Sequence, residues 1–356
     1  MSALDPYLPT IWFILVGVLF TGYAMLDGFD LGVGGLHLWV HKEEHRRLFL
    51  NSIGPVWDGN EVWLVTGGGA LFAAFPAVYA TIFSGFYLAF ILLLFALIFR
   101  AVSIEFRSKH NSSAWRGFWD FSFSASSVVA SILIGVAIGN LIEGIPLDGR
   151  QEYVGGFFNL LSPYAVFTGI TTAALFAMHG GIYLALKTEG ELHEIVRHWA
   201  WRTVLVFLGC YFIFNIWTLV ANPHVREVLA DRPYTAIIFI ANVLLVLAIP
   251  RELYHRRDFR AFLFSCGSML LLMALFACTM YPNLVYSSHA PADFNLNEFT
   301  LASNPWNLTI NNSRSTDLTL RNMLVIAVIG VPIVLSYTVC IYWIFRGKVK
   351  LHHDSY

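Results

Sequence analysis

Long runs of apolar residues alternate with short polar segments along the chain. A helix that crosses about 30 Å of hydrocarbon needs about 20 apolar residues, and most of the runs reach this length. The pattern predicts nine membrane-spanning helices, at residues 9–40, 57–74, 77–100, 120–142, 161–186, 200–221, 234–250, 260–281 and 320–345. The second predicted span is short, contains Gly67, Gly68 and Gly69, and is followed by Pro76.

The composition indicates a membrane protein. Apolar residues make up 57% of the 356 residues and charged residues 13%, whereas soluble domains contain about 45–50% and about 25%. One core of this size cannot bury so much apolar surface, and a formal net charge of −1 offers no basic field for nucleic acid. The sequence therefore predicts one integral membrane domain over residues 1–356. An ordinary soluble enzyme, a disordered chain and a nucleic-acid-binding protein are excluded.

Lys and Arg are distributed unevenly between the predicted connections. Most of them fall on the side of the C-terminus, for example Lys42, Arg100, Lys187 and Arg251. Because cytoplasmic loops are enriched in Lys and Arg, the sequence predicts an external N-terminus and a cytoplasmic C-terminus. No Lys or Arg lies inside the first predicted span.

Two features predict how the helices are arranged. The triplet Phe-Thr-Gly occurs at residues 20–22 and again at 167–169, in spans that run in the same direction. Such an echo indicates an internal repeat. We therefore predict an all-α fold of two four-helix bundles plus one peripheral helix. The outer loop 282–319 is predicted to form an ordered cap, because it contains apolar side chains to bury, namely Phe294, Phe299 and Trp306.

Four carboxyl groups stand in the first two predicted spans. Asp27 and Asp30 share one helix face, and Asp58 and Glu61 share another at the start of the second span. A charge at a helix centre costs about 2.5–3.5 kcal/mol to insert, so these residues need a reason to be there. One interpretation is a chain of proton-accepting groups open to the cytoplasmic side. The alternative is structural: Asp58 and Glu61 form a capping box, and Asp30 satisfies backbone groups near the glycines.

Histidine and tryptophan supply the other candidates. Only His37 and His179 lie in predicted spans, and two imidazoles could ligate a haem. The more ordinary interpretation is a hydrogen bond to a neighbouring backbone carbonyl. Trp57 and Trp63 flank the second acidic pair and are candidates for packing against a partner. The cysteines form no CxxC pair, so no metal site is predicted.

These residues resemble subunit II of the cytochrome bd quinol oxidases. The resemblance covers nearly the whole chain and is most specific in its first seventy-odd residues. The main matching stretches are LDGFDLGVG at 26–34, NSIGPVWDGN at 51–60 and VWLVTGGGALFAA at 62–74. Further stretches are FSGFY at 83–87, FRSK at 106–109, GVAIGNL at 135–141, GELH at 190–193 and TDLTL at 316–320.

The resemblance implies a prokaryotic respiratory enzyme in the bacterial inner membrane or the archaeal cell membrane. In that family, subunit II has nine spans and pairs with subunit I, which oxidises the quinol and holds two haems b and one haem d. Many members add a small single-span third subunit. The complex is an electrogenic quinol:oxygen oxidoreductase that reduces dioxygen to water with protons from the cytoplasmic side. No haem and no catalytic residue is expected in this chain.

The resemblance also implies roles for individual residues. Asp58 matches an acid in the family's cytoplasmic proton route. Asp27 and Asp30 match its DGFD motif, and Glu61 stands where some relatives are expected to have Gln. Trp57 and Trp63 are candidates for contacting or supporting the haems, and a structural quinone or lipid is expected between helices in some relatives.

Two other functions remain open from the residues alone. The first is a stand-alone proton-coupled transporter that uses Asp27 and Asp58. The second is a haem-binding membrane anchor that uses His37 and His179.

Overall fold

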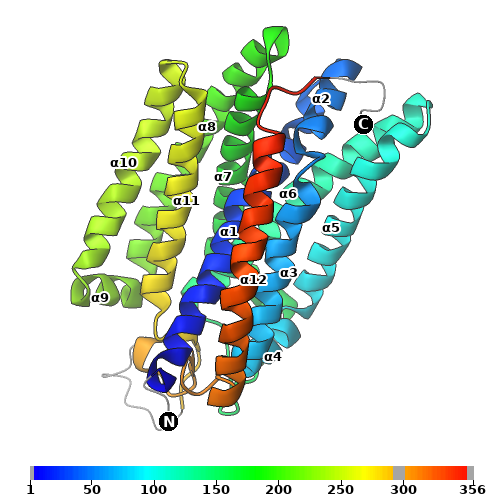
Figure 1. The fold of residues 1–356 in the computed structure, drawn as a ribbon. Helices are drawn as coiled ribbons and strands as arrows, with labels where there is room; N and C mark the ends of the chain where they lie inside the picture. The colour runs from blue at the N-terminus through cyan, green and yellow to red at the C-terminus, as the bar shows by residue number, and fades with distance from the viewer. Residues whose placement is uncertain (1–3, 292–300, 351–356) are drawn as a thin grey trace.

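The long apolar runs form helices that lie nearly parallel to one another (Figure 1). The computed structural model describes residues 4–291 and 301–350. Within these ranges, eight helical segments are long and apolar enough to cross a membrane. Their main helices are α1 (Leu8–Leu36), α5 (Tyr87–Phe106), α6 (Ser113–Glu143), α7 (Pro163–Lys187), α8 (Gly190–Ala221), α10 (Tyr234–Tyr254), α11 (Asp258–Met280) and α12 (Asp317–Ile344).

The helices form two bundles and one peripheral helix, as the sequence predicts. Helices α1, α5 and α6 pack with α3 (Trp57–Ala74), and α7, α8, α10 and α11 form the second group, to the left in Figure 1. Helix α12 lies against α1 and α3, and none of its most apolar window is buried. Helix α3 has 18 residues and is not among the eight spanning candidates, so the count of nine spans stays a prediction.

The predicted span at 77–100 is wrong in its bounds. Residues Pro76–Gly85 form a separate short helix, α4, which begins after non-helical Phe75 (φ −133°, ψ 65°). The chain turns again at Phe86 (φ −95°, ψ 17°), and α5 begins at Tyr87. Pro76 occupies the first helical position of α4, where its missing N–H costs nothing. One apolar run therefore contains both a short helix and a span.

Two polar segments that contain no long apolar run also form helices. These are α2 (Glu43–Ile53) and α9 (Pro223–Asp231), which lie at opposite ends of the bundles in Figure 1. Helix α2 buries His45, Phe49 and Ile53, which share one face at helical spacing. Short 3₁₀ helices complete the chain: η1 (Asp5–Tyr7), η2 (His37–Trp39), η3 (Arg107–Lys109), η4 (Phe157–Leu160) and η5 (Leu301–Ser303).

The described part of the loop 282–319 is ordered and caps the first bundle. Strands β1 (Asn283–Val285) and β2 (Leu308–Thr309) pair antiparallel. Val285 and Leu308 are buried in the same apolar cluster as Leu8 and Trp12 of α1. Trp306 is half-buried. Phe294 and Phe299, which were also predicted to be buried, lie outside the described residues.

The two bundles meet where α1 and α7 approach closely. A Cβ on Gly180 of α7 would lie 2.5 Å from the carbonyl carbon of Gly32 of α1. No side chain fits there, so small residues let the two backbones touch, as is common between membrane helices.

We expect Gly180→Leu to separate α1 from α7, because no neighbouring flexible side chain can move aside. The loss should be about 3 kcal/mol, at the upper end of overpacking effects. Gly209→Leu on α8 is the matched control, because no atom lies within 4 Å of its would-be Cβ. Thermal unfolding of both variants in mild detergent measures the difference. Equal unfolding midpoints would contradict the role of this contact.

Candidate functional site

Asp27 and Asp30 of α1 face Arg100 of α5, and all three side chains have no exposed surface. Arg100 donates from Nη1 to Oδ2 of Asp27 over 3.0 Å and from Nη2 to Oδ1 over 2.5 Å. Nη2 of Arg100 lies 4.0 Å from Oδ2 of Asp30. Such a bidentate pair is among the strongest side-chain interactions in proteins. The sequence assigned Arg100 to a polar connection; this was wrong, because Arg100 lies inside the bundle and neutralises Asp27.

A hydrogen-bond chain joins Asp30 to two further helices. Asn60 of α3 donates from Nδ2 to Oδ2 of Asp30 over 2.8 Å and to the carbonyl oxygen of Leu26 over 3.2 Å. The hydroxyl of Tyr342 of α12 donates to Oδ1 of Asn60 over 2.9 Å. Among the described residues, Oδ1 of Asp30 and the hydroxyl of Tyr23 are buried without a hydrogen-bond partner. Asp30 is therefore held by a side chain, with one oxygen left unbound.

Asp58 and Glu61 lie one turn apart on α3 in different surroundings. Asp58 is exposed and Glu61 is half-buried. Glu61 lies within electrostatic reach of Arg100 and Asp27. We call Asp27, Asp30, Asn60, Glu61 and Arg100 the carboxylate–arginine cluster. The N-cap residue of α3 is Val56, which makes no side-chain cap bond, so the capping-box interpretation is wrong.

A second polar network lies at the end of α1 and was missed by the sequence analysis. Asp120 of α6 is 1% exposed and accepts from Nε2 of His37 over 2.6 Å, Nε of Arg107 over 2.5 Å and Nη1 of Arg46 over 2.7 Å. Arg107 also donates twice to Glu43 of α2, over 3.0 and 2.8 Å. The signal was an acidic residue at the first position of a predicted span. Its partners are distant in the sequence, so the spacing could not reveal them.

Glu43 shows how this network fastens α2 to the bundle. Partial burial by itself would raise the pKa of its carboxyl, but the hydrogen bonds and charge of Arg107 and the charge of Arg116 outweigh burial and lower that pKa. A lowered pKa means that the ion pairs stabilise the fold at neutral pH. That contribution is lost as the pH falls through the lowered value.

The two buried histidines differ in how completely their ring nitrogens are engaged. Nε2 of His179 donates to the carbonyl oxygen of Met25 over 3.0 Å, and its Nδ1 lies 2.7 Å from Oγ of Ser265. The ring also stacks on Phe262 with centroids 4.9 Å apart. His37 is bound to Asp120 on a different helix. Nδ1 of His37 is buried without a hydrogen-bond partner among the described residues, whereas both ring nitrogens of His179 are engaged. The two rings are therefore not a free pair of haem ligands. Among the described residues, no cluster of three or more potential metal ligands occurs.

The two candidate tryptophans make contacts within the chain. The ring of Trp63 packs so closely on Gly22 of α1 that a Cβ there would clash with it. Trp57 packs against the apolar core around Phe49 and Ile53. Both rings are half-buried, and a contact of either one with a haem stays a prediction.

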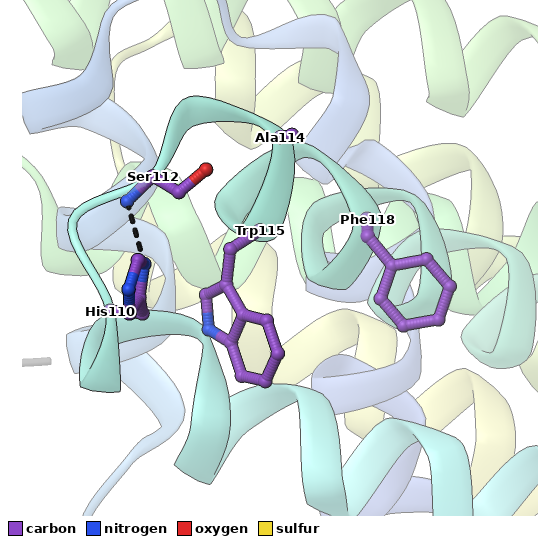
Figure 2. A pocket seen from close by; sticks show the side chains of 5 residues that line it. All are labelled: His110, Ser112, Ala114, Trp115 and Phe118. Atoms are coloured by element: carbon purple, nitrogen blue, oxygen red, sulfur yellow. Dashed lines mark hydrogen bonds between the residues drawn. The ribbon is translucent and has the colours of Figure 1, made fainter.

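Two hollows in the surface are large enough to consider as binding sites. Figure 2 shows the first, of about 580 Å³, at the turn between α5 and α6, where His110, Trp115 and Phe118 surround it. Its only marked hydrogen bond runs from the backbone N of Ser112 to Nδ1 of His110, over 3.0 Å. Phe118 is exposed and Trp115 is half-buried, and aromatic side chains in such positions are typical of a membrane interface. The second hollow, of about 390 Å³, lies between α6 and α8.

The fold and the cluster define a multi-pass membrane protein with buried ionisable groups, a class in which such groups mark ion or proton pathways. The family model described as cytochrome bd terminal oxidase subunit II matches residues 8–345. The chain belongs to this family, which confirms the resemblance noted in the sequence. It is thus a subunit of an oxidoreductase complex.

Individual relatives agree with this assignment. The chain is 36% identical to the cytochrome bd-I ubiquinol oxidase subunit 2 of Escherichia coli, over 95% of this chain and 94% of that one. It is 31% identical to the cytochrome bd ubiquinol oxidase subunit 2 of Bacillus subtilis, over 96% of each. A chain in the structure of bd oxidase from Geobacillus thermodenitrificans shares the fold, with a TM-score of 0.77 at 16% identity, over 95% of this chain and 98% of that one.

We expect Arg100→Gln to destabilise the protein by about 3–5 kcal/mol, because it leaves the Asp27 carboxylate buried without its cation. Adding Asp27→Asn should recover part of this loss. Arg256→Gln is the control, because Arg256 and its partner Glu194 are both exposed, at 68% and 58%. Thermal unfolding in detergent measures all four proteins. A loss for Arg100→Gln no larger than that of the control would contradict the inferred role of the pair.

Asp27→Asn alone should reduce assembly more than turnover, because it weakens the bond between α1 and α5. The yield of assembled protein and the activity per assembled enzyme measure the two effects separately. A fully assembled but slow enzyme would contradict this expectation.

Proposed function

We propose that this chain is the non-haem subunit of a quinol:oxygen oxidoreductase and delivers protons from the cytoplasmic side for the reduction of dioxygen to water. Its partner would be subunit I, which would hold the two haems b and the haem d and oxidise the quinol. The enzyme would be electrogenic, with the N-terminus of this chain outside and the C-terminus in the cytoplasm. Family membership supports the oxidase complex, and the engagement of both ring nitrogens of His179 within the chain supports haems in another chain.

The observation that carries the proton-delivery proposal is the position of Asp58. Its side chain is exposed on α3, next to exposed Val62 and Val65. A carboxylate that faces lipid is unfavourable, so this surface is better explained as one that a partner covers. The same surface includes Gly59 and Gly69, and small residues favour close helix packing in membranes.

Behind Asp58, the carboxylate–arginine cluster offers places where protons can reside. It contains one cation, Arg100, and three carboxyl groups, so it has fewer positive charges than carboxyls. Asp27 is fully engaged by Arg100, whereas Oδ1 of Asp30 has no partner among the described residues. Asp30 and Glu61 are therefore the groups free to exchange a proton, with Asp58 as the point of entry from the cytoplasm.

The proposal includes two further components. The uncovered face of α12 has room for a partner helix, including a small third subunit. A structural quinone or lipid would require space between helices of the bundles. The transporter alternative has less support, because the Asp27 that it requires is locked in an ion pair.

The first test is an affinity purification of this chain from its native membrane in mild detergent, followed by a visible spectrum. We expect a stoichiometric haem-bearing partner and a haem d band, because the proposal places the haems in that partner. A colourless chain that purifies alone would overturn the oxidase proposal and favour the transporter.

The second test concerns Asp58 in the purified complex. Asp58→Asn should slow quinol-driven oxygen consumption by at least about tenfold, or about 1.4 kcal/mol of barrier, with haem content and assembly unchanged. Asp58→Glu should restore most of the rate, because it keeps a titratable group. Glu194→Gln removes an exposed carboxylate from α8 and serves as the control. Normal turnover of Asp58→Asn with normal haem content would rule out proton delivery through this residue.

A further inference from the structure

The hollow between α6 and α8 is a groove on the side of the bundles. Small residues of α1 and α7 form its floor, namely Gly32, Gly35, Ala173 and Ala177. Val128 and Ser131 of α6 lie on one side, and Thr203 and Val206 of α8 lie on the other. Its volume is about 390 Å³. No lining residue belongs to α3 or α12, so a partner on the Asp58 surface would leave this groove open.

The groove offers almost no polar group along its length. The hydroxyl of Ser131 donates to the carbonyl oxygen of Ser127 over 2.7 Å, and that of Thr203 donates to the carbonyl oxygen of Ala200 over 3.0 Å. Both hydroxyl hydrogens are thus bound within their own helices. The remaining lining is apolar except at one end, so the groove suits a hydrocarbon chain.

Arg202 of α8 stands at that end and is the exception. Its side chain is exposed and lines the groove. In the described part of the chain it makes no hydrogen bond or ion pair. Its neighbour Arg197, one turn earlier, is paired with Asp258. Arg202 is therefore a cation beside an apolar groove without an anion from this protein.

The level of Arg202 in the membrane follows from Trp39. Trp39 comes after the end of α1, lines the same groove and contacts Trp199 with ring centroids 5.7 Å apart. Tryptophan gathers at the membrane–water interface. Leu31 and Gly32 line the groove one to two turns further into α1. The guanidinium is thus at the headgroup level, and the groove extends from it toward the hydrocarbon.

We propose that this groove binds an anionic phospholipid, with its phosphate on Arg202 and an acyl chain along the small residues of α1 and α7. A guanidinium forms bidentate hydrogen bonds with a phosphate, so the charge and the apolar groove match the two halves of one lipid. The bound lipid would lie between the two bundles, near the C-terminal end of α1.

The test is native mass spectrometry of the purified complex, delipidated and then titrated with phosphatidylglycerol or with phosphatidylcholine of the same chains. The wild type should bind phosphatidylglycerol more tightly than phosphatidylcholine. Arg202→Gln should lower the affinity for phosphatidylglycerol about fivefold, as expected for one cation near an anionic headgroup. Arg202→Lys should retain most of the affinity. Arg260→Gln, which removes another exposed cation two residues after Asp258, the partner of Arg197 on α8, should change nothing.

A second variant tests the groove separately from the charge. Ala177→Leu fills the floor and should weaken both lipids alike, while leaving Arg202 in place. Unfolding midpoints equal to the wild type show that the variants are folded. The proposal is overturned if Arg202→Gln binds phosphatidylglycerol as tightly as the wild type, or if Arg260→Gln loses as much. It is also overturned if both lipids bind the wild type equally, or if an isoprenoid quinone remains in the groove and excludes them.

Discussion

The buried pair between Asp27 and Arg100 is the interaction on which the first bundle depends. Both side chains are fully enclosed, and either charge left alone there would be severely destabilising. The pair therefore fixes how α1 and α5 lie against each other. From the same segment of α1, Asp30 reaches α3 through Asn60, and Asn60 reaches α12 through Tyr342. Four helices are thus held in register by one connected set of polar contacts.

On its opposite side, α1 is fixed by shape rather than by charge. Gly32 and Gly180 let α1 and α7 touch along their backbones, and His179 of α7 donates to the carbonyl oxygen of Met25 on α1. One face of α1 thus contributes carboxyl groups to the polar cluster of the first bundle. Its opposite face contacts α7 of the second bundle through small residues. A larger side chain at the contact would move the carboxyl groups away from Arg100. This explains why acidic residues and glycines alternate within a few positions of α1.

The carboxyl groups of the carboxylate–arginine cluster differ in how completely they are bound. Asp27 is saturated by Arg100, which suits a structural role. Asp30 keeps one oxygen without a partner among the described residues, and Glu61 is half-buried, one turn from Asp58 on α3. The carboxyl groups thus range from fully bound in the interior to exposed at the surface of α3. In the proposed function, protons would pass along these groups and across the surface of α3 to the subunit that holds the haems.

The sequence by itself determined the class of protein, most of its long helices and the family. Long apolar runs must form helices in lipid, since only then are the backbone groups satisfied, and this rule needs no knowledge of tertiary contacts. The sequence also identified candidate site residues, namely Asp27, Asp30, Asp58 and Glu61. Carboxyl groups in apolar runs are costly however the helices pack, so these positions stand out without a structure. The helices α2 and α9 were missed because a short amphipathic helix contains no long apolar run.

Only the tertiary structure decided the partners of these residues. The sequence placed Arg100 in a connection and Asp120 at the first position of a span, because both residues stand beside polar segments. Their partners lie 73 and 83 residues away, in Asp27 and His37. The separation of Asp58 from the buried cluster also depends on how α3 rotates against α1. Ion pairs and helix rotation are set by packing between distant segments, and local spacing carries no information about them.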